Sequence, residues 1–305
     1  MAYTLLSEIN PTSKHWTVCA RVSRLWEYRG NVDDAEIQHL DLVLVDEQGN
    51  AIYAEIPKEH VEAKRVLLQE EHIYTFRRFL VSPNKGKYRP VDSDYMIEIG
   101  YYTEIEELFD AAPTFPMYAY TLTPLENLDS YIGETRNFLD VIGVVKAVSN
   151  AASIQGSNQS STTTKRLVVI KDAKDCETTV TLWGQRAKDF DGEYVYEKEQ
   201  KNPVPALFVG ILMKRYGQNE GLSGGSACRW YISPNIPEAA AITSSLQTTH
   251  GATSSAQKRL FDVAAASDQN LSTQTTNLTE EHASHDVTDD KPDPTAEKNI
   301  TDQRI

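Results

Sequence analysis

Aromatic side chains stand next to basic ones at three places in the sequence. These are PNKGKYRP (83–90), MKRYGQNEG (213–221) and RLWEYRG (24–30). Their candidate binding residues are Lys85, Lys87 and Tyr88, then Lys214, Arg215 and Tyr216, then Arg24 and Trp26. A fourth stretch, TTVTLWGQRAKDF (178–190), ends a strand-like run with Trp183. Flat rings can stack on nucleic-acid bases, and lysine and arginine can contact the phosphates between them. These residue types predict a surface that binds a single-stranded nucleic acid.

In the alternative interpretation, the same rings only fill space. Tyr88 and Tyr216 would then be half-buried strand residues beside solvated lysines, since aromatic residues are common in strands. Trp183 would belong to a hydrophobic core. For Trp26, stacking on a ligand and packing inside the protein are equally compatible with the local sequence.

The sequence contains no GxxxxGK[ST] phosphate loop, no GxGxxG after a strand and no HExxH zinc motif. Its three cysteines, Cys19, Cys176 and Cys228, form no CxxC pair. Neither a zinc site nor a disulfide framework is therefore predicted. We expect a binding protein with no catalytic residues, no cofactor and no metal.

The elements that must position the candidate residues are short strands. In the first third of the chain, strand-like runs cover 15–26, 39–46, 51–56, 72–81 and 95–99, and one helical stretch covers 57–72. Turn residues separate the runs, as in DEQGN (46–50) and SPNKGK (82–87). Five strands with a helix after the third are typical of the OB fold, a small and partly open barrel.

The same order returns later in the chain. Strand-like runs cover 138–148, 165–172, 178–184, 205–216 and 228–232, and Asp172 in VIKDAKD corresponds to Asp46 in LVDEQGN. The sequence therefore predicts an all-β protein of two tandem OB-fold barrels with one short helix each, at 1–102 and 121–239. Residues 103–120 are predicted to be an extended linker and 149–164 a mobile loop.

Composition sets limits on these predictions. From 240 to 305 the chain is rich in Ser, Thr, Asn, Gln and Asp, so we predict a disordered acidic tail. The net charge of the chain is −14, and the tail has 5 Lys/Arg and 10 Asp/Glu, which leaves −9 for residues 1–239. This sign opposes long-range attraction of a nucleic acid, although local grooves govern contact. The sequence shows neither a signal peptide nor an apolar run long enough for a membrane span, so a soluble intracellular protein is expected.

Four segments together resemble a known family. TLLSEINPTSKHWTVCARVSRLWEYRG (4–30), LVLVDEQGNAIYAEI (42–56), TVTLWGQRAKDFDG (179–192) and YISPNIPEA (231–239) are similar to the tandem central OB domains of the large, DNA-binding subunit of replication protein A, especially its plant paralogues. The similarity runs over about residues 3–239. It implies non-enzymatic binding of single-stranded DNA in both barrels, in the nucleus, during DNA replication, repair or recombination.

The resemblance also assigns residues. Trp183 and Tyr216 match the stacking aromatics of the second barrel, and Tyr88 matches the hairpin aromatic of the first. Where the family usually has a phenylalanine on the third strand, this chain has Ile56. The first barrel is therefore expected to bind more weakly or to depend on Trp26.

Two parts of the family pattern are not found in this sequence: the N-terminal protein-interaction barrel, and the C-terminal barrel with its zinc ribbon and trimer-forming helix. The resemblance therefore implies a shortened relative and leaves assembly with other replication protein A subunits, or with repair proteins, open. A second hypothesis is a protein-interaction module with little affinity for nucleic acids. The charge of −9 in 1–239 and the isoleucine at 56 favour that alternative.

Overall fold

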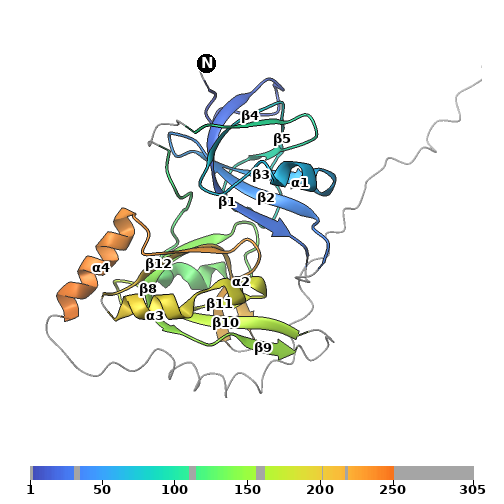
Figure 1. Cartoon of the computed structure of the whole chain (residues 1–305). Helices are drawn as coiled ribbons and strands as arrows, with labels where there is room; N and C mark the ends of the chain where they lie inside the picture. The colour runs from blue at the N-terminus through green and yellow to red at the C-terminus, as the bar shows by residue number, and fades with distance from the viewer. Residues whose placement is uncertain are drawn as a thin grey trace, which may run out of the picture.

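The computed structural model describes residues 3–30, 35–109, 115–155, 162–200, 202–216 and 219–250. Its strands form two sheets, one from each half of the chain, and Figure 1 shows the first half above the second. Within the described residues, no helix is both long and apolar enough to cross a membrane. Most of the predicted disordered tail, residues 251–305, lies outside the described part of the chain.

The first sheet has seven strands in the order β5-β6-β3-β2-β1-β4-β7. Its elements are β1 (Thr17–Tyr28), β2 (His39–Val45), β3 (Ala51–Pro57), α1 (Lys58–Arg65), β4 (Ile73–Arg77), β5 (Leu80–Pro83), β6 (Tyr95–Glu98) and β7 (Glu104–Glu107). The β3–β6 pair is parallel, and the other pairs are antiparallel. A parallel pairing between the strand before the helix and the last barrel strand is the expected arrangement of an OB fold.

A bend in one strand run curls this sheet. The predicted single run 72–81 is divided into β4 and β5, and Arg78 between them has a φ of 57°. β4 pairs with β1, whereas β5 pairs with β6. Because one short segment joins both sides of the sheet, the strands wrap around a common core instead of lying flat.

The second sheet closes on itself. Its described elements are the 3₁₀ helix η1 (Leu125–Tyr131), β8 (Leu139–Val148), β9 (Ala152–Gln155), β10 (Thr162–Lys171), β11 (Glu177–Trp183), α2 (Gln185–Asp189), α3 (Gly192–Glu199), β12 (Pro205–Tyr216), β13 (Asn219–Gly224), β14 (Arg229–Ile232) and α4 (Pro237–His250). The order β11-β13-β12-β8-β10 is closed by pairing of β10 with β11, and β11 runs parallel to β13. The predicted all-β, two-barrel fold is confirmed.

Equivalent turns support the repeat. In the first half, Asp46 Oδ1 accepts hydrogen bonds from the backbone N–H of Gln48 (3.0 Å) and Asn50 (2.9 Å). In the second half, Asp172 Oδ1 accepts from Lys174 N (2.8 Å) and Cys176 N (3.0 Å). An aspartate that bonds its own turn in this way fixes the hairpin between the second and third barrel strands.

Each half has its own apolar core. The first includes Val18, Ala20 and Val22 of β1, which alternate along the strand and so point to one face. The second is built in the same manner from β8, β10 and β12, with Phe190 and Phe208 stacked 6.3 Å apart. Burial of these alternating β-branched and aromatic residues stabilises both barrels.

Several predicted segments have more structure than expected. In the predicted linker 103–120, β7 pairs with β4, and Phe115 and Ala119 are buried. In the predicted loop 149–164, β9 pairs with the first residues of β10, and 156–161 lie outside the described residues. The second half also has several helices, so the prediction of one short helix in each barrel is wrong for this half.

The prediction that disorder begins at residue 240 is also wrong. α4 continues to His250. Ala239 and Ile242 pack in a cluster with residues of β8 and β12, and Tyr120 donates a hydrogen bond to Glu238 (2.9 Å). The helix is held by a few residues that contact the second sheet and Tyr120. The amino-acid composition of the segment therefore did not reveal it.

Polar and apolar contacts join the two halves. Arg229 forms an ion pair with Glu70 (2.8 Å), and the Tyr231 hydroxyl donates to the carbonyl of Ser23 (3.3 Å). The loop between β5 and β6 pairs with the segment before β8, through a bridge between Arg89 and Asn137. The loop that carries the first barrel's candidate residues is therefore held by the second barrel.

Candidate nucleic-acid interface

Trp183 is the last residue of β11, opposite Lys165 of β10, and its side chain is half-buried. The strand ends there because Gly184 has a φ of 56°, a conformation that favours glycine, and α2 starts at Gln185. The backbone N–H of Gly184 donates to Thr164 O (2.8 Å), which fixes the turn. The order Trp-Gly thus places an indole at the edge of the barrel.

The basic residues Lys214 and Arg215 lie near the end of β12. Lys214 is half-buried, and loss of hydration lowers the pKa of its ammonium group from the usual value. Arg215 is exposed, and its Nη2 lies 2.5 Å from Glu220 Oε1. The backbone of Tyr216 pairs with Asn219, while the position of its ring is outside what the structure describes.

The backbone positions of Trp183 and Tyr216 lie far apart along the sheet. β13 connects them: it begins at Asn219, opposite Tyr216, and ends at Gly224, opposite Leu182 of β11. Five residue steps along a strand cover roughly 17 Å. The two residues predicted to stack on bases therefore lie opposite the two ends of β13. Such a separation suits two different bases of an extended nucleic-acid strand.

In the first barrel, Lys85, Lys87 and Tyr88 lie in the loop between β5 and β6. Lys87 is exposed, whereas Tyr88 is half-buried with its ring 6.1 Å from that of Phe138. The backbone N–H of Tyr88 donates to Thr135 O (2.7 Å). Contacts with the second half thus fix the backbone of this loop.

The ammonium group of Lys85 bonds to the Glu55 carboxylate and lies 5.2 Å from the centre of the Tyr53 ring. Burial opposes ionisation of Glu55, but the hydrogen bond and charge of Lys85 hold the net pKa of this carboxyl below its usual value. Lys85 is therefore already paired with a carboxylate, which a phosphate would have to replace.

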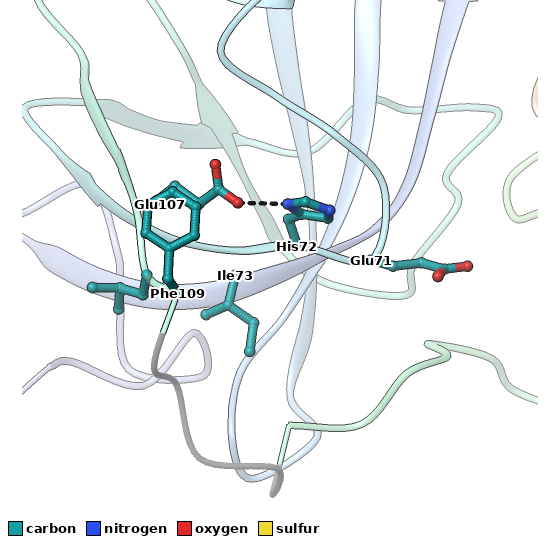
Figure 2. Close-up of a pocket in the computed structure, with 6 residues that line it drawn as sticks. Glu71, His72, Ile73, Glu107 and Phe109 are labelled. Carbon is teal, nitrogen blue, oxygen red and sulfur yellow. Dashed lines mark hydrogen bonds and ion pairs between the residues drawn. The ribbon is translucent and has the colours of Figure 1, made fainter.

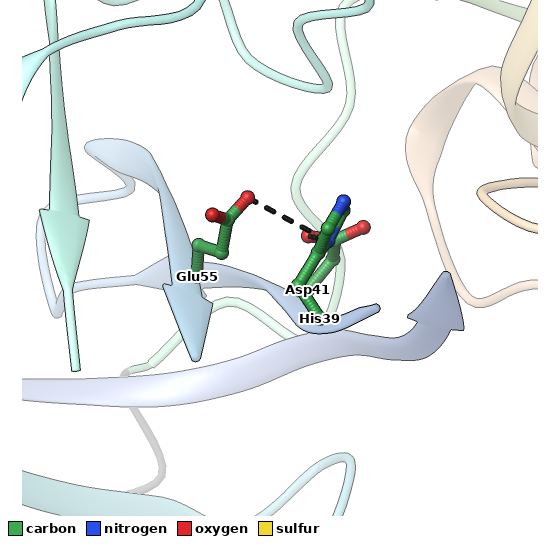
Figure 3. A group of neighbouring side chains, drawn as sticks. All are labelled: His39, Asp41 and Glu55. Carbon is green, nitrogen blue, oxygen red and sulfur yellow. Dashed lines mark hydrogen bonds and ion pairs between the residues drawn. The ribbon is translucent and has the colours of Figure 1, made fainter. Parts of the chain in front are cut away.

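Glu55 belongs to a cluster that sequence reasoning missed (Figure 3). His39 Nδ1 lies 2.7 Å from Asp41 Oδ1 and 3.5 Å from Glu55 Oε2, and the Tyr53 hydroxyl lies within hydrogen-bond distance of both carboxylates (2.6 and 2.7 Å). The available signal in the sequence was the spacing of two residues between His39 and Asp41 on β2. These side chains form a cluster with Glu55 only because the strand register places Asp41 opposite Glu55. Since Lys85 and Tyr53 already satisfy these oxygens, we assign no metal to the cluster.

Two predicted DNA contacts are wrong. Arg24 and Trp26 are only 2% and 6% exposed, so neither can meet a phosphate or a base in this arrangement. Arg24 Nη2 donates to Pro90 O (3.1 Å), and its guanidinium lies 5.9 Å from the Trp26 ring centre. Trp26 packs in a cluster that includes Ala227, so the second half covers this face of β1.

Ile56 lies on the core face of β3. It is 0% exposed and belongs to the apolar core of the first barrel. Its side chain therefore offers no contact to a ligand in this arrangement. The first barrel has no outward ring at the end of β3.

Other features of the described residues offer no catalytic arrangement. Figure 2 shows a shallow pocket lined by Glu71, His72, Ile73, Glu107, Leu108 and Phe109, in which His72 Nδ1 lies 2.5 Å from Glu107 Oε1. Its lining contains no serine, threonine or cysteine. The segment GLSGG (221–225) has the spacing of a serine-hydrolase elbow, but Ser223 lies within β13 instead of at a strand-to-helix turn.

Each half of the chain matches a known protein family. The family described as "Replication protein A OB domain" matches residues 126–214, and the family described as "Domain of unknown function DUF223" matches 7–130. The replication protein A 70 kDa DNA-binding subunit of Xenopus tropicalis is 27% identical over 235 residues, which are 77% of this chain and 36% of that protein. One of the replication protein A 70 kDa DNA-binding subunits of Arabidopsis thaliana is 24% identical, over 78% of this chain and 39% of that protein.

One solved structure is similar to this chain in its fold. A chain of a replication protein A heterotrimer bound to single-stranded DNA has a TM-score of 0.58 and 25% sequence identity, over 84% of this chain and 57% of that chain. This chain thus spans less than half the length of the two relatives. Over about three quarters of its length, it is similar to the large, DNA-binding subunits of replication protein A.

Proposed function

We propose that this protein binds single-stranded DNA without catalysis, in DNA replication, repair or recombination. The observation that carries the proposal is the position of Trp183: a half-buried indole at the edge of a barrel whose family includes DNA-binding subunits. Each base stacked on an aromatic ring contributes roughly 1–3 kcal/mol. Sequence preference is slight under this mechanism, because every base has a flat face.

The second barrel is the stronger site in this proposal. Lys214 has lost part of its hydration, so a phosphate would stabilise its charged form. The ion pair between Arg215 and Glu220 is at the surface, where such pairs contribute about 0–1 kcal/mol. A phosphate can therefore replace Glu220 at little cost. Tyr216 is proposed to stack a further base at the other end of β13.

The first barrel is the weaker site. Tyr88 and Lys87 are its proposed DNA contacts, while Lys85 must first leave Glu55. We assign one binding unit to residues 1–102 and the other to 121–239, with 103–120 between them. Two weak units on one chain bind jointly, because the first contact raises the effective concentration of the second.

The proposal includes nuclear localisation and, as candidate partners, other replication protein A subunits or repair proteins. Its support is similarity to the replication protein A DNA-binding subunits alone. The alternative, a protein-interaction module, is favoured by the carboxylates of Asp41 and Glu55 next to the candidate lysine of the first barrel. Carboxylates there repel phosphates.

Titration of fluorescent oligo-dT at low and moderate salt tests the proposal. We expect salt-dependent binding, and a loss of about 5- to 150-fold in affinity for Trp183→Ala, which corresponds to one stacked base. Tyr194→Ala is the matched control, because this exposed ring belongs to α3 of the same barrel. Absence of binding by the wild-type protein at low salt would refute the proposal and favour the protein-interaction module.

A further inference from the structure

Two adjacent tyrosines are exposed on the first barrel. Tyr101 and Tyr102, in the turn between β6 and β7, are 72% and 70% exposed, and their rings meet edge to face at 5.1 Å. Neither ring contributes to the core of the barrel. Aromatic surface that gathers at one exposed place is typical of interaction sites.

The turn that carries these rings is held firmly. Lys64 Nζ donates to the carbonyls of Tyr101 (3.2 Å) and Thr103 (2.6 Å). Thr103 is buried, and its hydroxyl accepts from the N–H of Gly100 (3.0 Å). A fixed backbone lowers the entropy lost when a ligand binds to the rings.

Cationic groups flank the two rings. The guanidinium of Arg78 lies 5.7 Å from the centre of the Tyr102 ring. Its ion pair with Glu104 (3.2 Å) joins two exposed side chains, so a competing anion can replace the carboxylate at little cost. Lys64 lies beside Tyr101. The centre of the His60 ring is 6.3 Å from the centre of the Tyr101 ring. Aromatic faces beside an exchangeable cation, Arg78, match the chemistry of a nucleic-acid strand.

Strand pairing places this turn at the end of β3. β3 and β6 run parallel with Glu55 opposite Glu98, and the N–H of Ile99 donates to Glu55 O (2.8 Å). Both strands therefore end together, and the turn follows two residues after Ile99. Ile56, whose position in the family usually carries a stacking ring, stands at this same end with its side chain in the core.

We propose that Tyr101 and Tyr102 form a stacking platform that extends the single-stranded DNA path of the first barrel beyond β3. The platform supplies the rings that Ile56 does not, and Arg78 contacts a phosphate next to the stacked base. This inference rests on the proposed function and adds to it a binding site in the first barrel.

The experiment compares two oligonucleotide lengths. OB folds cover roughly 4–16 nucleotides each, so an oligo-dT of about 8 nucleotides occupies one barrel and one of about 30 reaches both. For Tyr101→Ala/Tyr102→Ala we expect at least a fivefold loss of affinity for the long oligonucleotide and no change for the short one, which binds the stronger second barrel. Tyr101→Phe/Tyr102→Phe keeps both rings and should bind as the wild type does.

Phe109→Ala is the matched control, since this ring is 85% exposed in the same half and lies outside the platform. Equal affinity of the wild-type protein and the double alanine variant for the long oligonucleotide would overturn the platform alone. If the wild-type protein binds neither oligonucleotide, the proposed function fails together with the platform.

Discussion

Replacing Arg24 by leucine should destabilise the whole protein. Arg24 is buried between the two halves, and its positive charge acts on Asp140 of β8, which is only 5% exposed. Asp140 accepts hydrogen bonds from Thr121 N (2.9 Å) and Gly210 N (3.0 Å). Burial raises the pKa of this carboxyl, while Arg24 and the two N–H groups act in the opposite direction.

The expected loss follows from two opposing contributions. Removing the cation that acts on a buried carboxylate costs up to about 3–5 kcal/mol, the loss for a broken buried ion pair. Nε and Nη1 of Arg24 find no acceptor in the described part of the chain, and removing such unsatisfied donors returns about 1–3 kcal/mol. The net decrease in the free energy of unfolding is therefore about 2 kcal/mol, a large fraction of the roughly 5–15 kcal/mol of a typical domain.

Urea unfolding at two pH values gives the assay. Because the pKa of Asp140 is raised in the folded protein, its ionisation lowers stability as the pH rises from the ordinary value through the raised one. Loss of Arg24 enlarges this effect, so the variant should lose most at about pH 7 and least near pH 4. The control is Arg77→Leu, whose weak surface pair with Glu106 (3.8 Å) predicts a change within about 0.5 kcal/mol. The same loss at both pH values, or none at neutral pH, would refute this reasoning.

Two further predictions concern the acidic cluster and the thiols. Glu55→Gln releases Lys85 and removes a negative charge near the proposed DNA path, so oligo-dT should bind about two- to fivefold tighter in anisotropy titrations at low salt; unchanged or weaker binding would place the cluster outside that path. Burial raises the pKa of Cys228 to about 12 and that of Cys19 to about 11. Half-buried Cys176 should therefore react first with a thiol reagent on the native protein, and mass spectrometry that finds Cys228 modified first would contradict this ordering.

The barrels could be predicted from the sequence because their signals are local. The alternation of apolar residues, and the aspartate turns at Asp46 and Asp172, recur in the same order in both halves. Trp183 could be placed at a strand end because a glycine follows it directly. Such features depend on neighbours in the chain, and sequence patterns report those well.

Features that depend on distant contacts were not predicted. Nothing near Arg24 and Trp26 in the sequence tells that residues of the second half, such as Ala227, cover them. The cluster of Asp41 and Glu55 requires the register between β2 and β3. In α4, Ile242 becomes buried only against the second sheet. Tertiary contacts override local preference in each case.

The contact between the halves also limits how this protein can change in evolution. The loop of Tyr88 and Arg89 takes its backbone partners from Thr135 and Arg136, and Tyr231 reaches the carbonyl of Ser23. If one barrel were replaced by that of a relative, the other barrel would lose these hydrogen-bond partners. The two repeats, although they share one fold, are therefore expected to diverge as a matched pair.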